Sequence, residues 1–546
     1  MNRNTILILL STTFLSFAQV DTLWVKRHNG PGNYTDTPCA LEIDNNGNVY
    51  VTGSVSVGGP SSFTSDYATI KYDANGDSLW LVHYNGQWDE EDHAVGIKVD
   101  ENHNIYVCGY SMGAEATFDY TTIKYDSTGA AAWISNISGP WGDHDYPTDF
   151  AMDDSGNIYV TGYTNSSWMQ QDYMTIKYDS MGDTLWLRIY NHAANNNDVA
   201  TGLAVDQYGN AYVTGRSWDY VTQDDYLTIK YDANGNEVWI ARHNGVADSA
   251  DGANDVVVDS SGNVYIAGSS WFPGSGNDIV TIKYDVSGDT IWTRRYSGSG
   301  NSDDNPTKIL ADISGNVYVT GYSRETTIDY CTIKYDSNGN QLWVRTYDGL
   351  SSNVDRAHAM AIDDSGNVYI TGESINSGID NDYATIKYSS NGAQIWVAYY
   401  DGPANSHDRA YALALDDNGY VYVTGESFGG PGAYMDYLTI KYLQETGIEE
   451  IIPTKCLPAM TIRNSIFLNE SEIAITLSKP DNASLRIYDI QGRLIKTLVN
   501  AYFEEGEYYV RWMGYDTHER EVPAGVYLVR LMTSSNEITQ KIIKLH

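Results

Sequence analysis

Positive charge is scarce in this sequence. Lysine and arginine together number 33, against 71 aspartate and glutamate residues, which leaves a formal net charge of −38 and a pI near 4.4. A chain this acidic repels phosphate backbones. We therefore expect no nucleic-acid partner.

Cysteine and proline are also rare. Four cysteines in 546 residues cannot build a disulfide framework, so the fold must be held together by packing. Only 13 prolines stand beside 49 glycines, 45 tyrosines and 14 tryptophans. This composition is typical of an aromatic, turn-rich β protein and not of a disordered chain.

Long apolar runs are missing beyond the amino end. There, Arg3 precedes an apolar run over residues 6–17, and Ser16 and Ala18 supply the small residues of a cleavage site. This pattern predicts a signal peptide over residues 1–18. The alternative, a membrane anchor, needs about 20 apolar residues, so we expect no transmembrane segment in the mature chain.

Four sequence features are present in abundance, because each recurs eight times. They are a tryptophan, a segment of the type GNVYVTG, a segment of the type DYxTIKYD, and an aspartate two residues before a small residue or proline. The tryptophans, spaced by 51 to 56 residues, are Trp24, Trp80, Trp133, Trp186, Trp239, Trp292, Trp343 and Trp396. A period of this length suits a unit of four strands.

Alternating and β-branched residues mark four strands in each unit, and glycine-containing turns connect them without room for a helix. Antiparallel units of this kind stack radially as propeller blades. The chain starts with a lone strand at residues 22–28, and its last unit, residues 409–442, has only three strands. We predict an all-β fold in which residues 19–442 form an eight-bladed β-propeller of four-stranded blades, closed by the N-terminal strand; the alternative leaves one unit outside the ring.

The carboxyl end has a different composition. Residues 443–458 form an irregular stretch that we interpret as a linker. Residues 459–546 carry 10 basic and 11 acidic residues, so nearly all of the acidity belongs to the repeats. Alternating segments in this part predict a small C-terminal β-sandwich of the Ig-like kind.

The repeats resemble the SBBP family, named for β-propeller repeats, through DxxGNVYVTG followed by DYxTIKYDxxGxxxW over residues 22–442. The family name specifies seven blades, whereas the four features count eight. The KYDxxGxxxW element is also similar to the tryptophan-docking repeat of eight-bladed quinone enzymes, in which the tryptophan wedges between blades. That resemblance would imply adjacent cysteines, and no two cysteines are adjacent here.

The C-terminal segments SLRIYDIQGRLIKTLV, GEYYVRWMGYD and VPAGVYLVRL resemble the type A sorting domain of the type IX secretion system. The resemblance implies passage through the periplasm, contact with the type IX secretion machinery, and a final location outside the cell or on its outer surface. The usual NPF-type opening is not evident near residues 459–466. The alternative is an accessory sandwich that binds another molecule.

Motifs for chemistry are almost absent. Residues 109–113 match the GxSxG pattern of a nucleophile elbow, but they occupy ordinary repeat positions in a strand. No HExxH, zinc spacing or GxxxxGK loop occurs. We therefore predict no catalytic residues and favour a protein that is not an enzyme.

The recurring aspartates each stand just before the first strand of a unit, so we expect them to circle the mouth of the channel. They are Asp36, Asp92, Asp145, Asp198, Asp251, Asp304, Asp355 and Asp408. One interpretation is that each accepts hydrogen bonds from loop N–H groups. The other is a metal site, with Ca²⁺ as the only candidate cofactor.

Five tryptophans lie outside the repeat strands and the C-terminal domain. They fall in long, varied loops expected on one face of the ring, at Trp88, Trp141, Trp168, Trp218 and Trp271. Exposed aromatic side chains stack on sugar rings or anchor protein partners. We regard them as candidate ligand-binding residues, with packing against the ring as the structural alternative.

Together these features favour a secreted or cell-surface propeller that binds or adheres to an extracellular glycan or protein. An acidic rim would favour neutral or basic ligands. The alternatives are a secreted hydrolase or lyase acting on polysaccharide, and a mainly structural surface-layer protein.

Overall fold

The computed structural model describes residues 20–444 and 459–545, apart from 59–63, 114, 167–169, 195, 247, 352, 376–379, 431–433, 463–465, 468–470, 478–479, 490–491, 505, 519 and 534–536. The chain divides into two compact units, Met1–Glu445 and Thr446–His546. The expected signal peptide and nearly all of the expected linker lie outside the described residues. The described residues include no helix that could cross a membrane.

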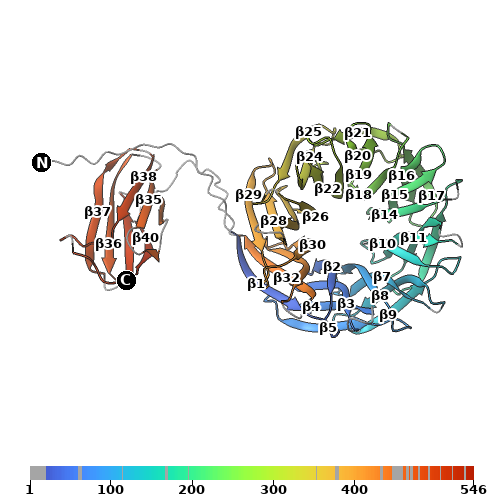
Figure 1. The fold of residues 1–546 in the computed structure, drawn as a ribbon, viewed down its shortest axis with the longest axis horizontal. Coiled ribbons are helices and arrows are strands. Elements are labelled where there is room, and N and C mark those ends of the chain that lie inside the picture. The colour runs from blue at the N-terminus through green and yellow to red at the C-terminus, as the bar shows by residue number, and fades with distance from the viewer. Residues whose placement is uncertain are drawn as a thin grey trace. The chain divides into compact units, whose positions relative to one another are not determined.

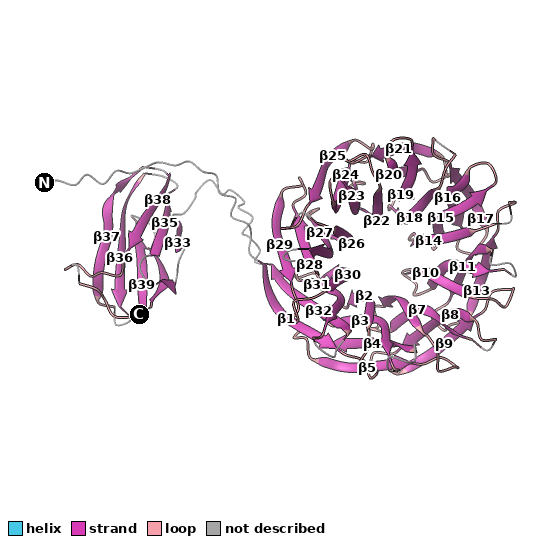
Figure 2. Ribbon diagram, viewed as in Figure 1, coloured by secondary structure: helices cyan, strands magenta, loops and turns pink. Residues whose placement is uncertain are grey.

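The first unit is a ring of eight four-stranded antiparallel sheets (Figures 1 and 2). Blades 1 to 4 consist of β2 (Thr37–Ile43), β3 (Val49–Ser56), β4 (Ser65–Tyr72) and β5 (Ser78–Tyr84); β6 (His93–Val99), β7 (Ile105–Met112), β8 (Phe118–Tyr125) and β9 (Ala131–Ile137); β10 (Asp145–Met152), β11 (Ile158–Asn165), β12 (Gln171–Tyr178) and β13 (Thr184–Tyr190); β14 (Asp198–Val205), β15 (Ala211–Asp219), β16 (Gln223–Tyr231) and β17 (Glu237–His243).

Blades 5 to 8 consist of β18 (Asp251–Val258), β19 (Val264–Phe272), β20 (Gly276–Tyr284) and β21 (Thr290–Tyr296); β22 (Asp304–Ala311), β23 (Val317–Arg324), β24 (Ile328–Tyr335) and β25 (Gln341–Tyr347); β26 (Asp355–Ile362), β27 (Val368–Ile375), β28 (Asn381–Tyr388) and β29 (Gln394–Tyr400); β30 (Asp408–Leu415), β31 (Val421–Phe428), β32 (Met435–Gln444) and β1 (Val20–His28). The first strand of each blade lies nearest the centre of the ring, and the fourth lies at its edge (Figure 1).

The two ends of the repeat region close the ring. Strand β1 pairs antiparallel with β32, with Val25 opposite Ile440. This is the closure predicted from the lone strand at one end and the three-stranded unit at the other. The eight-bladed, all-β fold is therefore confirmed.

The repeated tryptophans dock each blade onto the next. The Trp186 indole N–H, for example, donates to the Ala233 carbonyl of the following blade at 3.2 Å. Gly235 adopts a φ of 78° there, and a Cβ at this position would lie 2.7 Å from the Trp186 ring. Glycine is thus required both by the turn and by the close approach of the ring.

The eighth blade differs because its outer strand comes from the other end of the chain. It has no turn between its third and fourth strands to meet Trp396, and among the described residues the Trp396 indole N–H has no hydrogen-bond partner. Gln444 takes over part of the turn's role. Its side chain accepts a hydrogen bond from Lys387 at 2.7 Å and donates to the Gly419 carbonyl at 2.5 Å.

The C-terminal unit is a small β-sandwich, as predicted. One sheet contains β33 (Ala459–Ile462), β35 (Ser471–Leu477) and β38 (Gly506–Trp512); the other contains β34 (Ile466–Phe467), β40 (Glu537–Lys544), β39 (Gly525–Met532), β36 (Asp481–Asp489) and β37 (Leu494–Phe503). Leu485, Trp512 and Val529 form the centre of its core.

Candidate ligand-binding face

Two sets of loops meet on one face of the ring, which we call the loop face. They are the loops that join consecutive blades and the loops between the second and third strands of each blade. Hydrogen bonds hold the sets together: the Asp92 N–H donates to the Ser65 carbonyl at 2.7 Å, and the Gln171 N–H donates to Asn197 Oδ1 at 3.2 Å. Short turns connect the strands on the opposite face.

The loop tryptophans predicted from the sequence lie on this face. Trp88 and Trp141, in the loops between blades 1 and 2 and between blades 2 and 3, are 48% and 41% exposed. Trp271, at the end of β19, is 39% exposed, and Trp218, at the end of β15, packs edge-on against Tyr220 with ring centres 4.9 Å apart. Trp168 lies outside the described residues.

These four tryptophans are dispersed. In the described part of the chain, no ring contact joins any two of them. They are exposed enough to contact a ligand, but they do not form one platform. Their role as ligand-binding residues stays a prediction.

The eight recurring aspartates are buried, with exposed fractions of 0 to 2%. Each uses one carboxylate oxygen to accept a backbone N–H from the loop before it, at 2.5 to 2.8 Å: the donors are Gly30, Gly86, Gly139, His192, Gly245, Gly298, Gly349 and Gly402. These bonds fix the path of the chain from one blade to the next. Burial raises the pKa of Asp36 and of Asp145 to about 6.

A set of residues that the sequence-based prediction overlooked lies beside these aspartates. In each blade, the residue after the aspartate pairs across the strands with the residue that follows the glycine of the GNVYVTG segment. We call these residues the inner rim: Thr37 and Ser54, His93 and Tyr110, Tyr146 and Tyr163, Val199 and Arg216, Gly252 and Ser269, Asn305 and Tyr322, Arg356 and Glu373, Arg409 and Glu426.

Blades 2 and 3 make the inner rim aromatic. The Tyr110 ring lies 5.1 Å from His93 and 5.0 Å from Tyr146, and Tyr146 lies 5.4 Å from Tyr163. Phe118, the first residue of β8, and His144, in the loop before β10, extend this row; Phe118 packs 5.2 Å from Tyr110 and 5.2 Å from His144. All six rings are half-buried, so together they form a partly exposed aromatic row.

Blades 7 and 8 make the inner rim polar. Arg409 bridges two buried carboxylates, with Glu373 at 2.8 Å and Glu426 at 3.0 Å. Arg356 donates to Glu373 at 3.0 Å, and the Tyr411 hydroxyl donates to Glu426 at 2.8 Å. The carboxylates are 5% and 7% exposed, whereas the arginine side chains are 38% and 36% exposed. This rigid network therefore presents N–H donors and not carboxylates to solvent.

Burial also sets the charge of His93, one of the two histidines in the aromatic row. It lowers the pKa of His93, although the neighbouring Glu91 carboxylate opposes this effect. His93 is therefore neutral at pH 7. Its Nδ1 lies 2.9 Å from the Ser54 hydroxyl, and its Nε2 lies 3.8 Å from Glu91.

One signal in the sequence could have revealed the inner rim. The residue after the glycine of the GNVYVTG segment changes between serine, tyrosine, arginine and glutamate, while the positions before it hardly change. A position that varies within an otherwise repeated strand is not needed by the blade. Its side chain is free to serve another purpose.

Comparisons with known proteins identify both parts of the chain. The Beta-propeller repeat model, SBBP, matches residues 139–167, 185–220, 243–274, 291–326 and 345–380. The Secretion system C-terminal sorting domain model matches residues 469–545. The chain thus carries SBBP repeats and a sorting tail, which directs export by the type IX machinery to the cell surface or the extracellular space.

One curated relative is the uncharacterized WD repeat-containing protein L264 of Acanthamoeba polyphaga mimivirus, 23% identical over 452 residues. The match covers 66% of this chain but only 30% of that protein.

Three solved structures are distantly similar to this chain. They are the periplasmic gluconolactonase PpgL of Pseudomonas aeruginosa (12% identity, 74% of this chain and 99% of that one, TM-score 0.38), PorZ of the type IX secretion system of Porphyromonas gingivalis (14%, 93% and 74%, 0.26) and a PL25 ulvan lyase (13%, 62% and 92%, 0.36). At these TM-scores the likenesses do not bear on function.

Proposed function

We propose that this exported propeller is a binding protein that takes an extracellular glycan on its loop face, at the inner rim. The observation that carries the proposal is the gathering of non-repeated aromatic residues in one place. Six half-buried rings form a continuous row across blades 2 and 3, where the repeated framework does not require them.

The chemistry of the inner rim fits a saccharide. The C–H faces of sugar rings pack on tyrosine and tryptophan side chains, while their hydroxyl groups need hydrogen-bond partners of fixed position. The aromatic row offers ring faces on which a sugar can pack. On blades 7 and 8, Arg356 and Arg409 offer hydrogen-bond donors, which two buried glutamates hold in fixed positions.

The negative charge of the loop face limits the class of glycan that it can bind. The loop face carries acidic side chains near the aromatic row, including Glu91, Glu115 and Asp143, and the chain as a whole has a net charge of −38. A polyanion would be repelled over about a Debye length, roughly 8 Å at physiological salt. Neutral glycans are therefore preferred over acidic ones.

A glycan array tests the proposal. The probes are the purified wild-type protein, the double variant Tyr110→Ala/Tyr146→Ala, and the control Tyr208→Ala. Tyr208 is 73% exposed in a turn of the opposite face, between β14 and β15. We expect neutral glycans bound by the wild type and the control to be lost with the double variant. If no glycan is bound, or if the double variant binds like the wild type, the proposal is wrong.

A second candidate function is hydrolysis of an ester on a polysaccharide. The observation that favours it is the contact between Ser54 Oγ and His93 Nδ1 at 2.9 Å, which places a neutral histidine beside a hydroxyl. Nucleophilic serine enzymes need this contact together with a group that orients the histidine. Glu91 lies 3.8 Å from Nε2, too far for a hydrogen bond, so binding is the better-supported function. Release of acetate from acetylated glycans by the wild type, abolished in Ser54→Ala, would reverse this order.

A further inference from the structure

Blade 4 continues the inner rim beyond the aromatic row. Its rim residue Arg216 occupies the position that Tyr163 has in blade 3, directly after the glycine of the repeated segment. Burial raises the pKa of Tyr163, and the positive charge of Arg216 opposes this effect. The guanidinium of Arg216 therefore lies close to the end of the aromatic row.

Arg216 is more exposed than the other two arginines of the inner rim. Its side chain is 49% exposed, and the carboxylate that pairs with it, Asp224, lies 3.9 Å away, beyond hydrogen-bond distance. Arg356 and Arg409, by contrast, donate to buried glutamates at 2.8 to 3.0 Å. The next blade also leaves room, because Gly252 stands there and an added Cβ would lie 3.5 Å from the Arg216 Cβ. Arg216 can thus offer its N–H donors to a ligand.

Two aromatic side chains belong to the same hairpin as Arg216. Trp218 lies two residues further along β15, so it shares a face of the strand with Arg216, and it stands opposite Asp224 of β16. Tyr220, in the turn that follows, packs edge-on against Trp218 with ring centres 4.9 Å apart and is 76% exposed. An exposed aromatic pair, a guanidinium and a carboxylate therefore meet at the end of this hairpin.

Arg242, from the fourth strand of the blade, fixes the end of this hairpin. It donates to the Ser217 carbonyl at 2.9 Å and to the Ser217 hydroxyl at 3.0 Å, and it lies 2.6 Å from the buried carboxylate of Asp225. Ser217 stands between Arg216 and Trp218 in the chain, so these bonds hold the backbone that carries both side chains. Groups held in this way lose little conformational freedom when a ligand binds.

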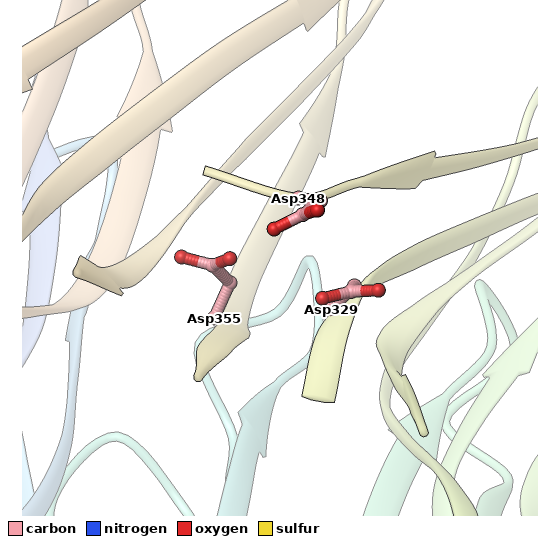
Figure 3. A group of neighbouring side chains, drawn as sticks. All are labelled: Asp329, Asp348 and Asp355. Carbon is pink, nitrogen blue, oxygen red and sulfur yellow. The ribbon is translucent and has the colours of Figure 1, made fainter. Parts of the chain in front are cut away.

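Support by an arginine is not a property of every blade. In blade 6, Thr346 stands at the register that Arg242 has in blade 4. At the boundary between blades 6 and 7, the carboxylates of Asp329, Asp348 and Asp355 lie together, with an oxygen of each within 4.8 Å of the others (Figure 3). This boundary is therefore acidic, whereas blade 4 combines a supported hairpin with an exposed arginine and two aromatic rings.

We propose that Arg216, Trp218, Tyr220 and Asp224 form a second saccharide subsite, and that the ligand of the loop face is a linear, neutral oligosaccharide that occupies this subsite and the aromatic row together. The proposal rests on the proposed function of the inner rim and specifies its ligand as a chain instead of a single sugar. The subsite offers an aromatic surface for the C–H face of a sugar ring, and a donor and an acceptor for its hydroxyl groups. The charges of the arginine and the aspartate cancel, which suits a neutral sugar.

A chain that reaches both places gains affinity without a stronger contact at either. When one end of the chain is bound at the aromatic row, its other sugars stay close to blade 4, so their effective concentration at the second subsite is high. A short oligosaccharide reaches only one of the two places. Affinity should therefore rise with the length of the chain.

The test is calorimetric titration of the full-length protein with disaccharides and hexasaccharides. The probes are cello-, laminari- and malto-oligosaccharides, together with fragments of the same two lengths from every neutral glycan that the array identifies. The wild type should bind the hexasaccharide about tenfold more tightly than the disaccharide of the same linkage. Tyr220→Ala and Arg216→Ala should each abolish most of this difference, while the affinity for the disaccharide stays close to that of the wild type.

The matched control is Val221→Ala, in the same turn as Tyr220 and 75% exposed, which should keep the preference for the hexasaccharide. Equal affinity of the wild type for both lengths, or a preference that survives in both Tyr220→Ala and Arg216→Ala, would overturn the second subsite and leave the proposed function standing. Absence of binding to every probe would overturn both proposals.

Discussion

Neighbouring positions in the second strand of each blade vary in different ways. The segment up to the glycine is repeated because the framework uses it: the Tyr159 hydroxyl, for example, shares its proton between the turn carboxylate of Asp153 at 3.0 Å and the Gly209 carbonyl of the next blade at 2.9 Å. The residue directly after the glycine belongs to the inner rim and changes from blade to blade. The repeated positions therefore stabilise the propeller, whereas the inner rim is free to vary and can serve binding.

The inner rim itself differs between two parts of the ring. Blades 2 and 3 present aromatic rings, whereas blades 7 and 8 present arginines held by buried glutamates. The four-stranded blade that holds the aromatic residues has the same strands and turns as the one that holds the arginines. A single repeated scaffold thus places two different chemistries at one face, which is what recognition of an amphipathic ligand such as a sugar requires.

The largest expected effect comes from the framework. Trp186→Ala removes a ring that is 6% exposed and wedged against the next blade, so the free energy of unfolding should fall by about 3 to 5 kcal/mol. Urea denaturation measures it. The companion pair Trp186→Phe and Trp396→Phe isolates the hydrogen bond of the indole. Of these two side chains, only Trp186 has a carbonyl acceptor among the described residues, so its replacement should cost about 1 kcal/mol more.

A pH-dependent effect of intermediate size is expected at Asp172. This carboxylate is fully buried, and neither oxygen has a hydrogen-bond partner in the described part of the chain. Burial together with Asp198 raises its pKa to about 7. Because the unfolded value is about 3.9, the folded protein holds this proton more tightly and loses stability as the pH rises toward and through 7. Asp172→Asn should therefore raise the melting temperature more at pH 8 than at pH 5.

The control for Asp172 is Asp225→Asn. Asp225 is paired with Arg242 at 2.6 Å, so its replacement leaves a partly buried guanidinium without its carboxylate and should destabilise the protein at both pH values. If the two variants show the same dependence on pH, then a paired and an unpaired buried aspartate do not differ in their effect on stability, and the explanation given for Asp172 is wrong.

A smaller loss is expected at the turn that receives the docked tryptophan. Gly235→Ala forces a side chain into a left-handed conformation and toward the Trp186 ring, which should cost about 1 to 3 kcal/mol. Thermal unfolding measures it. Gly252→Ala is the control, since φ there is not positive and the added Cβ would meet only Arg216 at 3.5 Å.

The smallest effect on stability is expected at the exposed loop tryptophans. Trp88→Ala and Trp141→Ala remove side chains that are about half exposed, so the melting temperature should stay within about 2 °C of the wild type, while glycan binding weakens. Early unfolding of either variant would show that the ring packs the loop onto the blade. It would then belong to the framework and not to the binding face.

The framework could be predicted from the sequence because it repeats. Eight copies of the tryptophan, the GNVYVTG segment and the DYxTIKYD segment specify the strands, and the incomplete ends specify the closure at Val25 and Ile440. The inner rim could not be placed in the same way. The row of His93, Tyr110 and Tyr146 joins residues from two blades, and only packing of the ring shows that they touch.

The role of the inner rim is tested most directly by measuring glycan binding and stability on the same variants. The wild type, Tyr110→Ala/Tyr146→Ala and the turn-face control Tyr208→Ala are titrated with a neutral glycan selected from the array, and each is melted under the same conditions. We predict that the double variant loses at least tenfold in affinity, with a loss of unfolding free energy well below that of Trp186→Ala, while Tyr208→Ala matches the wild type. Unchanged affinity in the double variant, or a stability loss as large as that of Trp186→Ala, would contradict the claim that the inner rim serves binding and not the fold.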